Sequence, residues 1–217
     1  LGEATTLASV QAFSPAIAAA FQQTAVVSIA LSLLLILIYI WVRFGNLKYS
    51  FAAVVCLVHD CIAALGLIAL IEILFEVDSV RPFLESLLLQ PFRIDLNLVA
   101  AMLTIIGYSL NDTIVIMDRI RENRGKLPYA SREVINDSIN QTLSRTAITS
   151  GTTILASAIL YIYGGAGVRA FAFTLTVGVL VGTYSSVAIA APLVWSRRPG
   201  GAQPKDTALR RQPRLPA

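Results

Sequence analysis

Charged residues are scarce in this sequence, and histidine and cysteine are nearly absent. Only 14% of its 217 residues are charged and 56% are hydrophobic. In a soluble domain, roughly a quarter of the residues are charged. The mean hydropathy is +0.70. So few charges indicate that lipid surrounds much of the chain. The deficit excludes an ordinary soluble domain and favours a membrane protein.

The small number of cysteine and histidine residues excludes the commonest metal sites. Cys56 and Cys61 lie in one apolar run, where their spacing directs the two side chains differently on a helix. No second cysteine or histidine pair is present to complete a zinc site. There is also no Walker loop and no nucleophile beside a base. We therefore expect no metal, no cofactor and no enzyme activity, so that an ion gradient or a partner must drive any work.

Five segments are long and apolar enough to cross a bilayer, which takes about 20 helical residues. Backbone groups in hydrocarbon must be hydrogen-bonded within the segment, so each is expected to be a helix. The glycine-rich stretch 164–167 predicts a tight hairpin between the last two. The sequence thus predicts an all-α, polytopic membrane bundle of five spanning helices, at 24–42, 50–71, 96–117, 146–163 and 170–195.

The remaining segments suggest how the chain is divided. Residues 1–23 are expected to close an extracytoplasmic segment, and residues 24–195 to form the transmembrane domain, with a cytoplasmic loop at about 118–145. Within that loop, the apolar spacing at 131–140 predicts an amphipathic helix on the inner membrane face, or a docking surface. Residues 196–217 are rich in proline, glycine and arginine, and are expected to be a disordered basic tail near anionic lipid. No nucleic-acid partner is expected.

Lysine and arginine are distributed unevenly between the two ends of the predicted bundle. Fourteen of the seventeen fall in 43–49, in 118–145 and in the tail after Trp195. The other three are Arg81, Arg93 and Arg169. Loops rich in basic residues stay in the cytoplasm. The N-terminus is therefore predicted outside and the C-terminus inside.

Ionisable groups in a spanning helix are costly unless they face a partner or a water-filled cavity. The second span carries His59 and Asp60, and the third carries Asn111 and Asp112. Asn111 and Asp112 are expected to point into the bundle. His59 and Asp60 are adjacent and are expected on different helix faces, which leaves Asp60 without an obvious partner.

Asp112 has two interpretations. Its carboxylate is either a fixed partner for a cation or a hydroxyl, which holds two helices together, or a protonatable group on a proton path. Arg145, at the start of the fourth span, is the expected partner, in a bidentate pair that protonation of Asp112 would weaken. Alternatively, the Arg145 side chain reaches lipid phosphates.

Small residues predict where helices approach each other closely. Gly178 and Gly182 are four residues apart in the last span, and Gly107 lies in the third. Such residues let helix backbones come together in lipid. We therefore expect helix contacts at all three glycines.

Four ordered motifs resemble the SecF family of the bacterial Sec protein-export machinery. The resemblance covers about residues 25–195. The motifs are IYIWVRFGNLKYSFAAVVCLVHD at 38–60, which ends in VHD at 58–60, GYSLNDTIVIMDRIREN at 107–123, SINQTLSRTAITS at 138–150 and FAFTLTVGVLVGTYSSVAIAAPLV at 171–194.

The resemblance implies a multi-pass protein of the bacterial inner (plasma) membrane, related to the resistance–nodulation–division (RND) transporters. Such a protein pairs with SecD and uses the proton gradient (the proton motive force) to assist preprotein translocation with the SecYEG channel. The implied partners are SecD, SecYEG, the preprotein and membrane lipids. The motifs assign the family's functional acid to Asp112 and its arginine to Arg145. Asn111 and Asp60 are the further candidates for proton coupling that the residues themselves suggest.

A full SecF has six spans and an extracytoplasmic domain after the first, so this chain is expected to be a fragment or the end of a SecD–SecF fusion. Two other functions stay open. A small-molecule or lipid exporter of the same superfamily would share the buried acid, although the NDTIVIMDRIRE run at 111–122 favours SecF. In a non-transporting membrane scaffold, Asp112 and Arg145 would only hold helices together.

Overall fold

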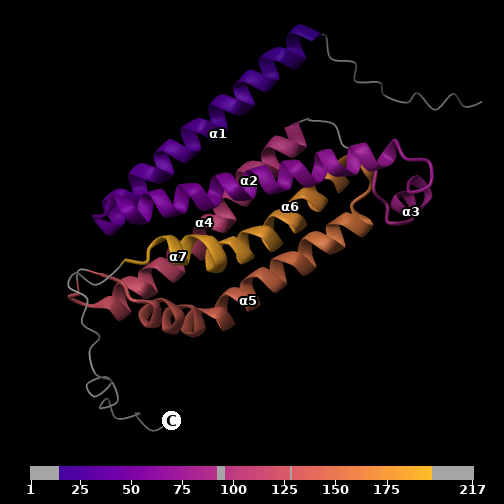
Figure 1. The fold of residues 1–217 in the computed structure, drawn as a ribbon. Coiled ribbons are helices and arrows are strands. Elements are labelled where there is room, and N and C mark those ends of the chain that lie inside the picture. Colours follow the sequence, from indigo (N-terminus) through magenta and orange to yellow (C-terminus); the bar gives the residue numbers. More distant parts are fainter. Residues whose placement is uncertain (1–14, 92–95, 128, 197–217) are drawn as a thin grey trace, which may run out of the picture.

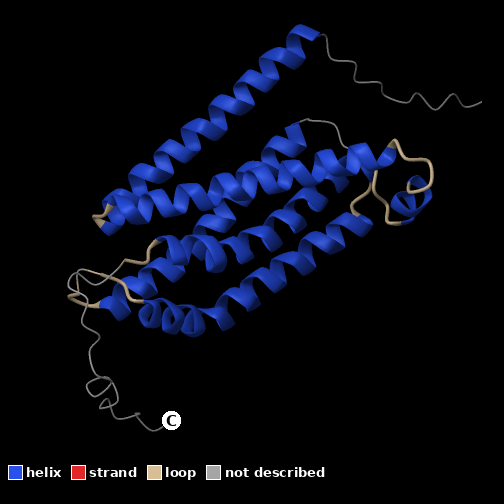
Figure 2. Ribbon diagram, in the orientation of Figure 1, coloured by secondary structure: helices blue, strands red, loops and turns tan. Residues whose placement is uncertain are grey.

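A computed structural model describes residues 15–91, 96–127 and 129–196, most of them in helices (Figures 1 and 2). Within these ranges there is no strand, and five helices are long and apolar enough to cross a membrane. The predicted all-α bundle of five spans is therefore confirmed. The elements are α1 (Pro15–Phe44), α2 (Leu47–Phe75), α3 (Arg81–Ser86), α4 (Leu96–Arg124), α5 (Arg132–Tyr163), α6 (Ala166–Ser185), the π-helix η1 (Ser186–Ala190) and α7 (Ala191–Leu193).

Short polar and glycine signals fix the helix boundaries. The side chain of Asn46 accepts a hydrogen bond from a backbone N–H of the first turn of α2, and Ser131 does the same for α5. Gly45 and Gly165 have φ angles of 64° and 76° in the turns that join α1 to α2 and α5 to α6. Glycine adopts this conformation without steric cost. Both turns are short, so each joins its two helices in an antiparallel hairpin (Figure 1).

Helix α6 lies at the centre of the bundle. It packs along α5, α4 and α2, and α4 also packs against α2 and α5. Helix α1 is peripheral: it follows α2 from their shared turn and diverges toward its own N-terminal end (Figure 1). Helices α2, α4 and α5 therefore pack around α6, and α1 lies on the outside against α2.

The last span contains a wide turn immediately before a proline. Pro192 has no N–H, and its ring excludes the normal α-helical bond to the carbonyl four residues earlier. The backbone adopts π geometry over Ser186–Ala190, and the N–H of Ala191 bonds to the carbonyl of Ser186. A π turn of this kind adds one residue to a helix without ending it.

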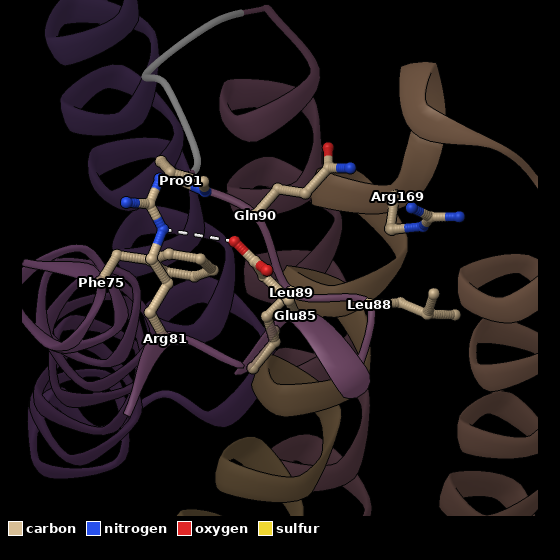
Figure 3. A pocket seen from close by; sticks show the side chains of 8 residues that line it. All are labelled: Phe75, Arg81, Glu85, Leu88, Leu89, Gln90, Pro91 and Arg169. Atoms are coloured by element: carbon tan, nitrogen blue, oxygen red, sulfur yellow. Dashed lines mark hydrogen bonds and ion pairs between the residues drawn. The ribbon is translucent and has the colours of Figure 1, made fainter. Parts of the chain in front are cut away.

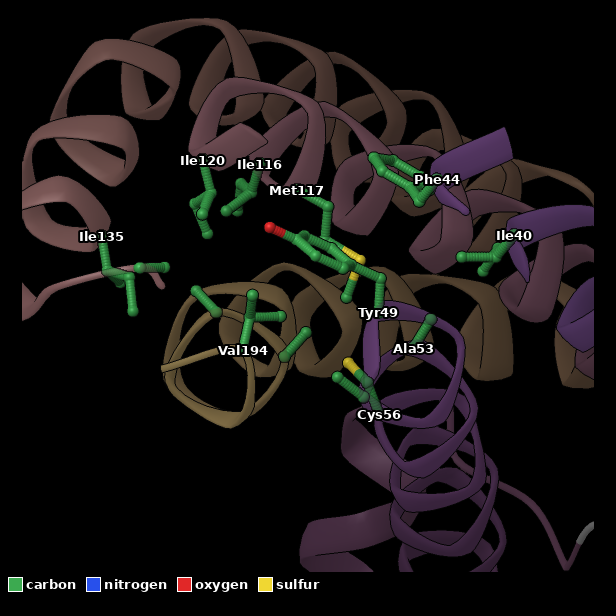
Figure 4. Close-up of a cluster of buried hydrophobic side chains, with 14 residues drawn as sticks. Ile40, Phe44, Tyr49, Ala53, Cys56, Ile116, Met117, Ile120, Ile135 and Val194 are labelled. Carbon is green, nitrogen blue, oxygen red and sulfur yellow. The ribbon is translucent and has the colours of Figure 1, made fainter. Parts of the chain in front are cut away.

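A buried apolar cluster closes the end of the bundle that holds the α1–α2 turn (Figure 4). The rings of Phe44 and Tyr49 stack there with their centroids 5.2 Å apart. The cluster joins the helices of both termini of the described chain. Its large members are Ile40, Phe44, Tyr49, Ile116, Met117, Ile120, Ile135 and Val194.

The first ten residues of α5 differ from the prediction of a separate amphipathic helix at 131–140. One continuous helix runs from Arg132 to Tyr163. Ile135 is buried, and Val134 and Ile139 pack against the apolar cluster of Figure 4. The apolar residues of this segment therefore pack against the chain's own core, and its position on the membrane surface or against a partner stays a prediction.

The basic segments meet at the same end of the bundle. Arg43 forms an ion pair with Asp118 at 3.1 Å, and Lys48 donates a hydrogen bond to the backbone carbonyl of Trp195. The guanidinium of Arg132 lies 5.3 Å from the centre of the Trp195 ring. The side of the membrane on which this end lies stays a prediction. The predictions for residues 1–14 and 197–217 fall outside the described residues.

Candidate proton-coupling site

The two acids of the spans lie near the middle of α2 and α4. Asp60 is 0% exposed and Asp112 is 2% exposed. A buried acid surrounded by helices in lipid must find its hydrogen bonds within the protein. The two carboxylates do so on different faces of α4, in two clusters that both involve α6.

The first cluster forms around Asp112. Ser150 Oγ of α5 donates a hydrogen bond to Asp112 Oδ2 at 3.3 Å, and lies 2.6 Å from Thr183 Oγ1 of α6. The hydroxyl of Tyr108, one turn before Asp112 on α4, donates to Ser150 at 3.4 Å. Neutral hydroxyls therefore connect the carboxylate of Asp112 to α5 and, through Ser150, to α6.

Arg145 does not form the predicted ion pair with Asp112; Ser150 holds the carboxylate instead. The buried polar residues of α5 include Thr146 and Ser150, which are four residues apart and face the bundle. Arg145 precedes Thr146 and is rotated from this stripe by about 100°. Its side chain is exposed and lines a cleft of about 350 Å³ between the basic ends of α4 and α5.

That cleft reaches close to the first cluster. Its α4 wall runs from Ile114 to Glu122 and includes Asp118. Val115, which also lines the cleft, is three residues from Asp112 and therefore its neighbour on the helix surface, so the cleft ends about one turn from the buried acid. Arg145 thus stands on the polar approach to Asp112 without touching it.

The second cluster forms around Asp60, for which the sequence suggested no partner. Ser109 Oγ of α4 donates a hydrogen bond to Asp60 Oδ2 at 2.5 Å. His59 Nδ1 lies 3.1 Å from Asp60 Oδ1. His59 and Asp60 start on different helix faces, with side chains 42% and 1% exposed, and the imidazole turns back toward the neighbouring carboxylate. Nearby, Cys56 Sγ donates to Ser185 Oγ at 3.2 Å.

Two glycines of α6 let α4 pack closely against it. A Cβ atom at Gly178 would collide with the side chain of Ile105. A Cβ atom at Gly182 would lie 3.0 Å from Ser109 Cβ and 3.6 Å from Asp60 Oδ2. Gly182 therefore provides the space in which Ser109 reaches Asp60.

Gly107 and Asn111 lie elsewhere than predicted. Asn111 is exposed, and its side chain makes no hydrogen bond within the part of the chain that the structure describes. Gly107 is exposed too, and a Cβ atom there would meet nothing within 4 Å. With Ala100 and Thr104 they form what we call the small-polar face of α4, exposed along its whole length. A spanning helix that faces lipid carries large apolar residues, so this face fits a partner helix better than lipid.

The hydroxyls that hold the acids were missed at the level of sequence. Serine and threonine are common in spanning helices, so Ser109, Ser150 and Thr183 do not stand out as site residues. One signal existed on α5, where Thr142, Thr146 and Ser150 repeat every four residues. Such a repeat places hydroxyls along one helix face, which indicates a polar contact with a neighbouring helix.

A second cavity, of about 250 Å³, lies at the other end of the bundle and contains none of the predicted site residues (Figure 3). Arg81 and Glu85 form an ion pair at 3.2 Å on its wall, and Leu88 has a φ angle of 60°. Arg169 of α6 completes the polar lining. Over the described ranges, no three histidine, cysteine or acidic side chains gather as metal ligands.

Known proteins share both the sequence and the fold. A family model described as the C-terminal part of the protein export membrane protein SecD/SecF matches residues 1–198. The chain is 39% identical over 216 residues to the protein translocase subunit SecF of Desulfurispirillum indicum, covering 98% of this chain and 62% of that protein. It is 40% identical over 201 residues to the protein translocase subunit SecDF of Brucella abortus, covering 91% of this chain and 23% of that protein.

A crystal structure of SecDF from Thermus thermophilus, titled a translocon-associated membrane protein, matches with a TM-score of 0.64 and 39% identity. The match covers 83% of this chain and 22% of that one. The chain spans 62% of the length of the SecF relative from Desulfurispirillum indicum. The resemblance seen in the four motifs is therefore confirmed. The chain belongs to the SecD/SecF family of protein export membrane proteins, of which it carries the C-terminal membrane region.

Proposed function

We propose that this chain is the membrane part of a SecF subunit that pairs with SecD in the bacterial inner membrane. There it uses the proton gradient to assist preprotein translocation through the SecYEG channel. Relatives in which SecD and SecF form one chain support the SecD partner. The observation that carries the proposal is that Asp112, buried in mid-span, is held by a hydroxyl and not by a cation.

Protonation changes the hydrogen bonds that Asp112 can make. An ionised carboxylate only accepts, whereas a protonated carboxyl also donates. Ser150 donates to the carboxylate; once Asp112 carries a proton, it can donate to the Ser150 oxygen, and the Ser150 proton turns toward Thr183. Because Ser150 connects α4, α5 and α6, a proton on Asp112 reorients bonds between all three helices. We infer that this reorientation drives relative movement of the helices.

Arg145 acts as an intermittent partner in this proposal. A guanidinium keeps its charge at any physiological pH, and that of Arg145 lies in the α4–α5 cleft. A movement of α5 along α4 by about one turn would bring it level with Asp112. The ionised carboxylate then pairs with Arg145, and proton loading releases it.

The test is export of a Sec-dependent preprotein by cells that carry Asp112→Asn or Arg145→Ala in the complete SecD–SecF complex. We expect each variant to abolish the gradient-dependent part of export while the membrane level and the co-purification of SecD stay normal. Asp137→Asn is the matched control, because Asp137 is an exposed acid of α5 that lies outside the cleft and both clusters. It should retain export.

Normal export by Asp112→Asn would refute the coupling role. Export lost only because the complex falls apart would reduce Asp112 to a contact that holds helices together, as in a scaffold. Intact complexes that move a small molecule or a lipid, but no preprotein, would point to an exporter.

A further inference from the structure

His59 occupies a position between the interior and the exterior of the bundle. It is the single histidine of the sequence and lies in mid-span on α2. Its side chain is 42% exposed, whereas that of Asp60 is 1% exposed. The 3.1 Å contact from Nδ1 to Asp60 Oδ1 therefore joins a buried carboxylate to a group that reaches the outside of the chain's bundle.

The surroundings of Asp60 leave few routes for a proton. Ser109 of α4 occupies its other oxygen, and Gly182 of α6 presents only backbone there. The thiols of Cys56 and Cys61 are buried on the same helix. Within the described residues, His59 is the only basic side chain in contact with Asp60. The imidazole is thus the direct connection between the Asp60 carboxylate and the surface.

We propose that His59 is the proton-exchange group of Asp60, so that the two residues form a second protonatable unit beside Asp112. Imidazole suits this role, because it takes up and releases protons near neutral pH and has two nitrogen atoms on opposite sides of the ring. In loading, Nε2 binds a proton from water, and the Nδ1 proton passes to Asp60 Oδ1. The products are a neutral carboxyl and an imidazole protonated at Nε2. Unloading is the reverse, so that no proton is gained or lost.

The unit is connected to the site of the proposed function, on which this inference rests. Ser109 donates to the ionised Asp60, and Asp112 follows Ser109 by three residues on α4. Residues three apart on a helix are neighbours. A hydrogen bond to an ionised carboxylate is stronger than one to a neutral carboxyl, so protonation of Asp60 at Oδ1 weakens the bond that Ser109 donates to Oδ2. The protonation of Asp60 therefore changes the strength of the hydrogen bond between α2 and the turn of α4 that carries Asp112.

The experiment measures proton flux into proteoliposomes that contain the purified SecD–SecF complex, with an imposed pH gradient and an internal pH-sensitive dye. His59→Asn keeps an amide N–H near Asp60 Oδ1 but cannot titrate, and His59→Ala removes both properties. We expect both variants to slow the flux by a similar factor, on the order of 100-fold for loss of a proton-transfer group. The pH dependence of the residual flux should also flatten. Ile62→Asn, a polar change at an exposed site on the next turn, is the matched control and should retain the flux.

If His59→Asn keeps the wild-type rate and pH profile, the imidazole only positions Asp60 and the relay is refuted. Asp112→Asn, measured in parallel, separates this failure from that of the proposed function. Loss of flux in Asp112→Asn together with normal flux in His59→Asn overturns the relay alone. Normal flux in Asp112→Asn overturns the proposed function, and the relay inference falls with it.

Discussion

At the scale of single residues, the buried acids of this bundle are held by hydroxyl groups. A hydroxyl both donates and accepts, so it can satisfy a carboxylate and also a protonated carboxyl. A guanidinium only donates, so it cannot accept the new O–H, and its ion pair is lost when the acid takes up a proton. Ser150 and Ser109 therefore allow Asp112 and Asp60 to change protonation state without leaving a buried polar group unsatisfied.

The glycines provide a matched pair of substitutions at this scale. Gly178→Ala places a methyl group against Ile105, and overpacking of this kind costs about 1–3 kcal/mol. Gly107→Ala meets open space and should be neutral, or stabilising by up to about 1 kcal/mol through higher helix propensity. Thermal unfolding of the complete SecF chain purified without SecD would measure both, because in the complex a partner helix can also pack on Gly107. An equal loss of stability in the two variants would contradict the open space at Gly107.

At the scale of helices, composition predicted the spans well, because burial in lipid requires long apolar helices whatever their contacts. The continuous α5 and the π-helix could not be predicted, since they depend on a core that the two ends of the chain build together and on the local effect of Pro192. The acids were found because charge is conspicuous in a span. The sequence did not predict that Asn111 is exposed on the bundle, because the reason for a polar residue there is a partner helix outside this chain.

The small-polar face of α4 leads to a prediction about the partner. Asn111→Cys in the complete complex should form a cross-link with a cysteine on SecD, because an exposed amide in mid-span needs a protein neighbour. Leu155→Cys, on the exposed apolar face of α5, should react with a lipid-soluble maleimide instead. If the Asn111→Cys variant reacts with the lipid-soluble reagent and never cross-links, lipid covers this face and the prediction is wrong.

At the scale of the whole molecule, the two ends of the bundle differ in chemistry. The end with the α1–α2 turn combines ion pairs with cation–aromatic contacts, such as Arg43 with Asp118 and Arg132 with Trp195. The opposite end carries α3 and the cavity of Figure 3, with few basic side chains. This asymmetry is what the positive-inside rule requires of an oriented membrane protein.

The predicted orientation can be measured directly. A reporter enzyme that is active only outside the cytoplasm, fused after Ala217, should be inactive, and the same reporter inserted after Asp78 should be active. Both fusions belong in the complete SecF chain, produced together with SecD. The reverse pattern would overturn the assignment of inside and outside, although the contacts within the bundle would stay the same.

The wide turn at Ser186–Ala190 also bears on the history of the last span. A π turn accommodates a one-residue insertion. The segment before it keeps Gly178 against Ile105, and the segment after it keeps Val194 in the apolar cluster, in spite of the additional residue. A homologue that lacks this residue is therefore expected to have an unbroken α-helix there with both contacts in place, so the position tolerates changes in length that the rest of the bundle does not.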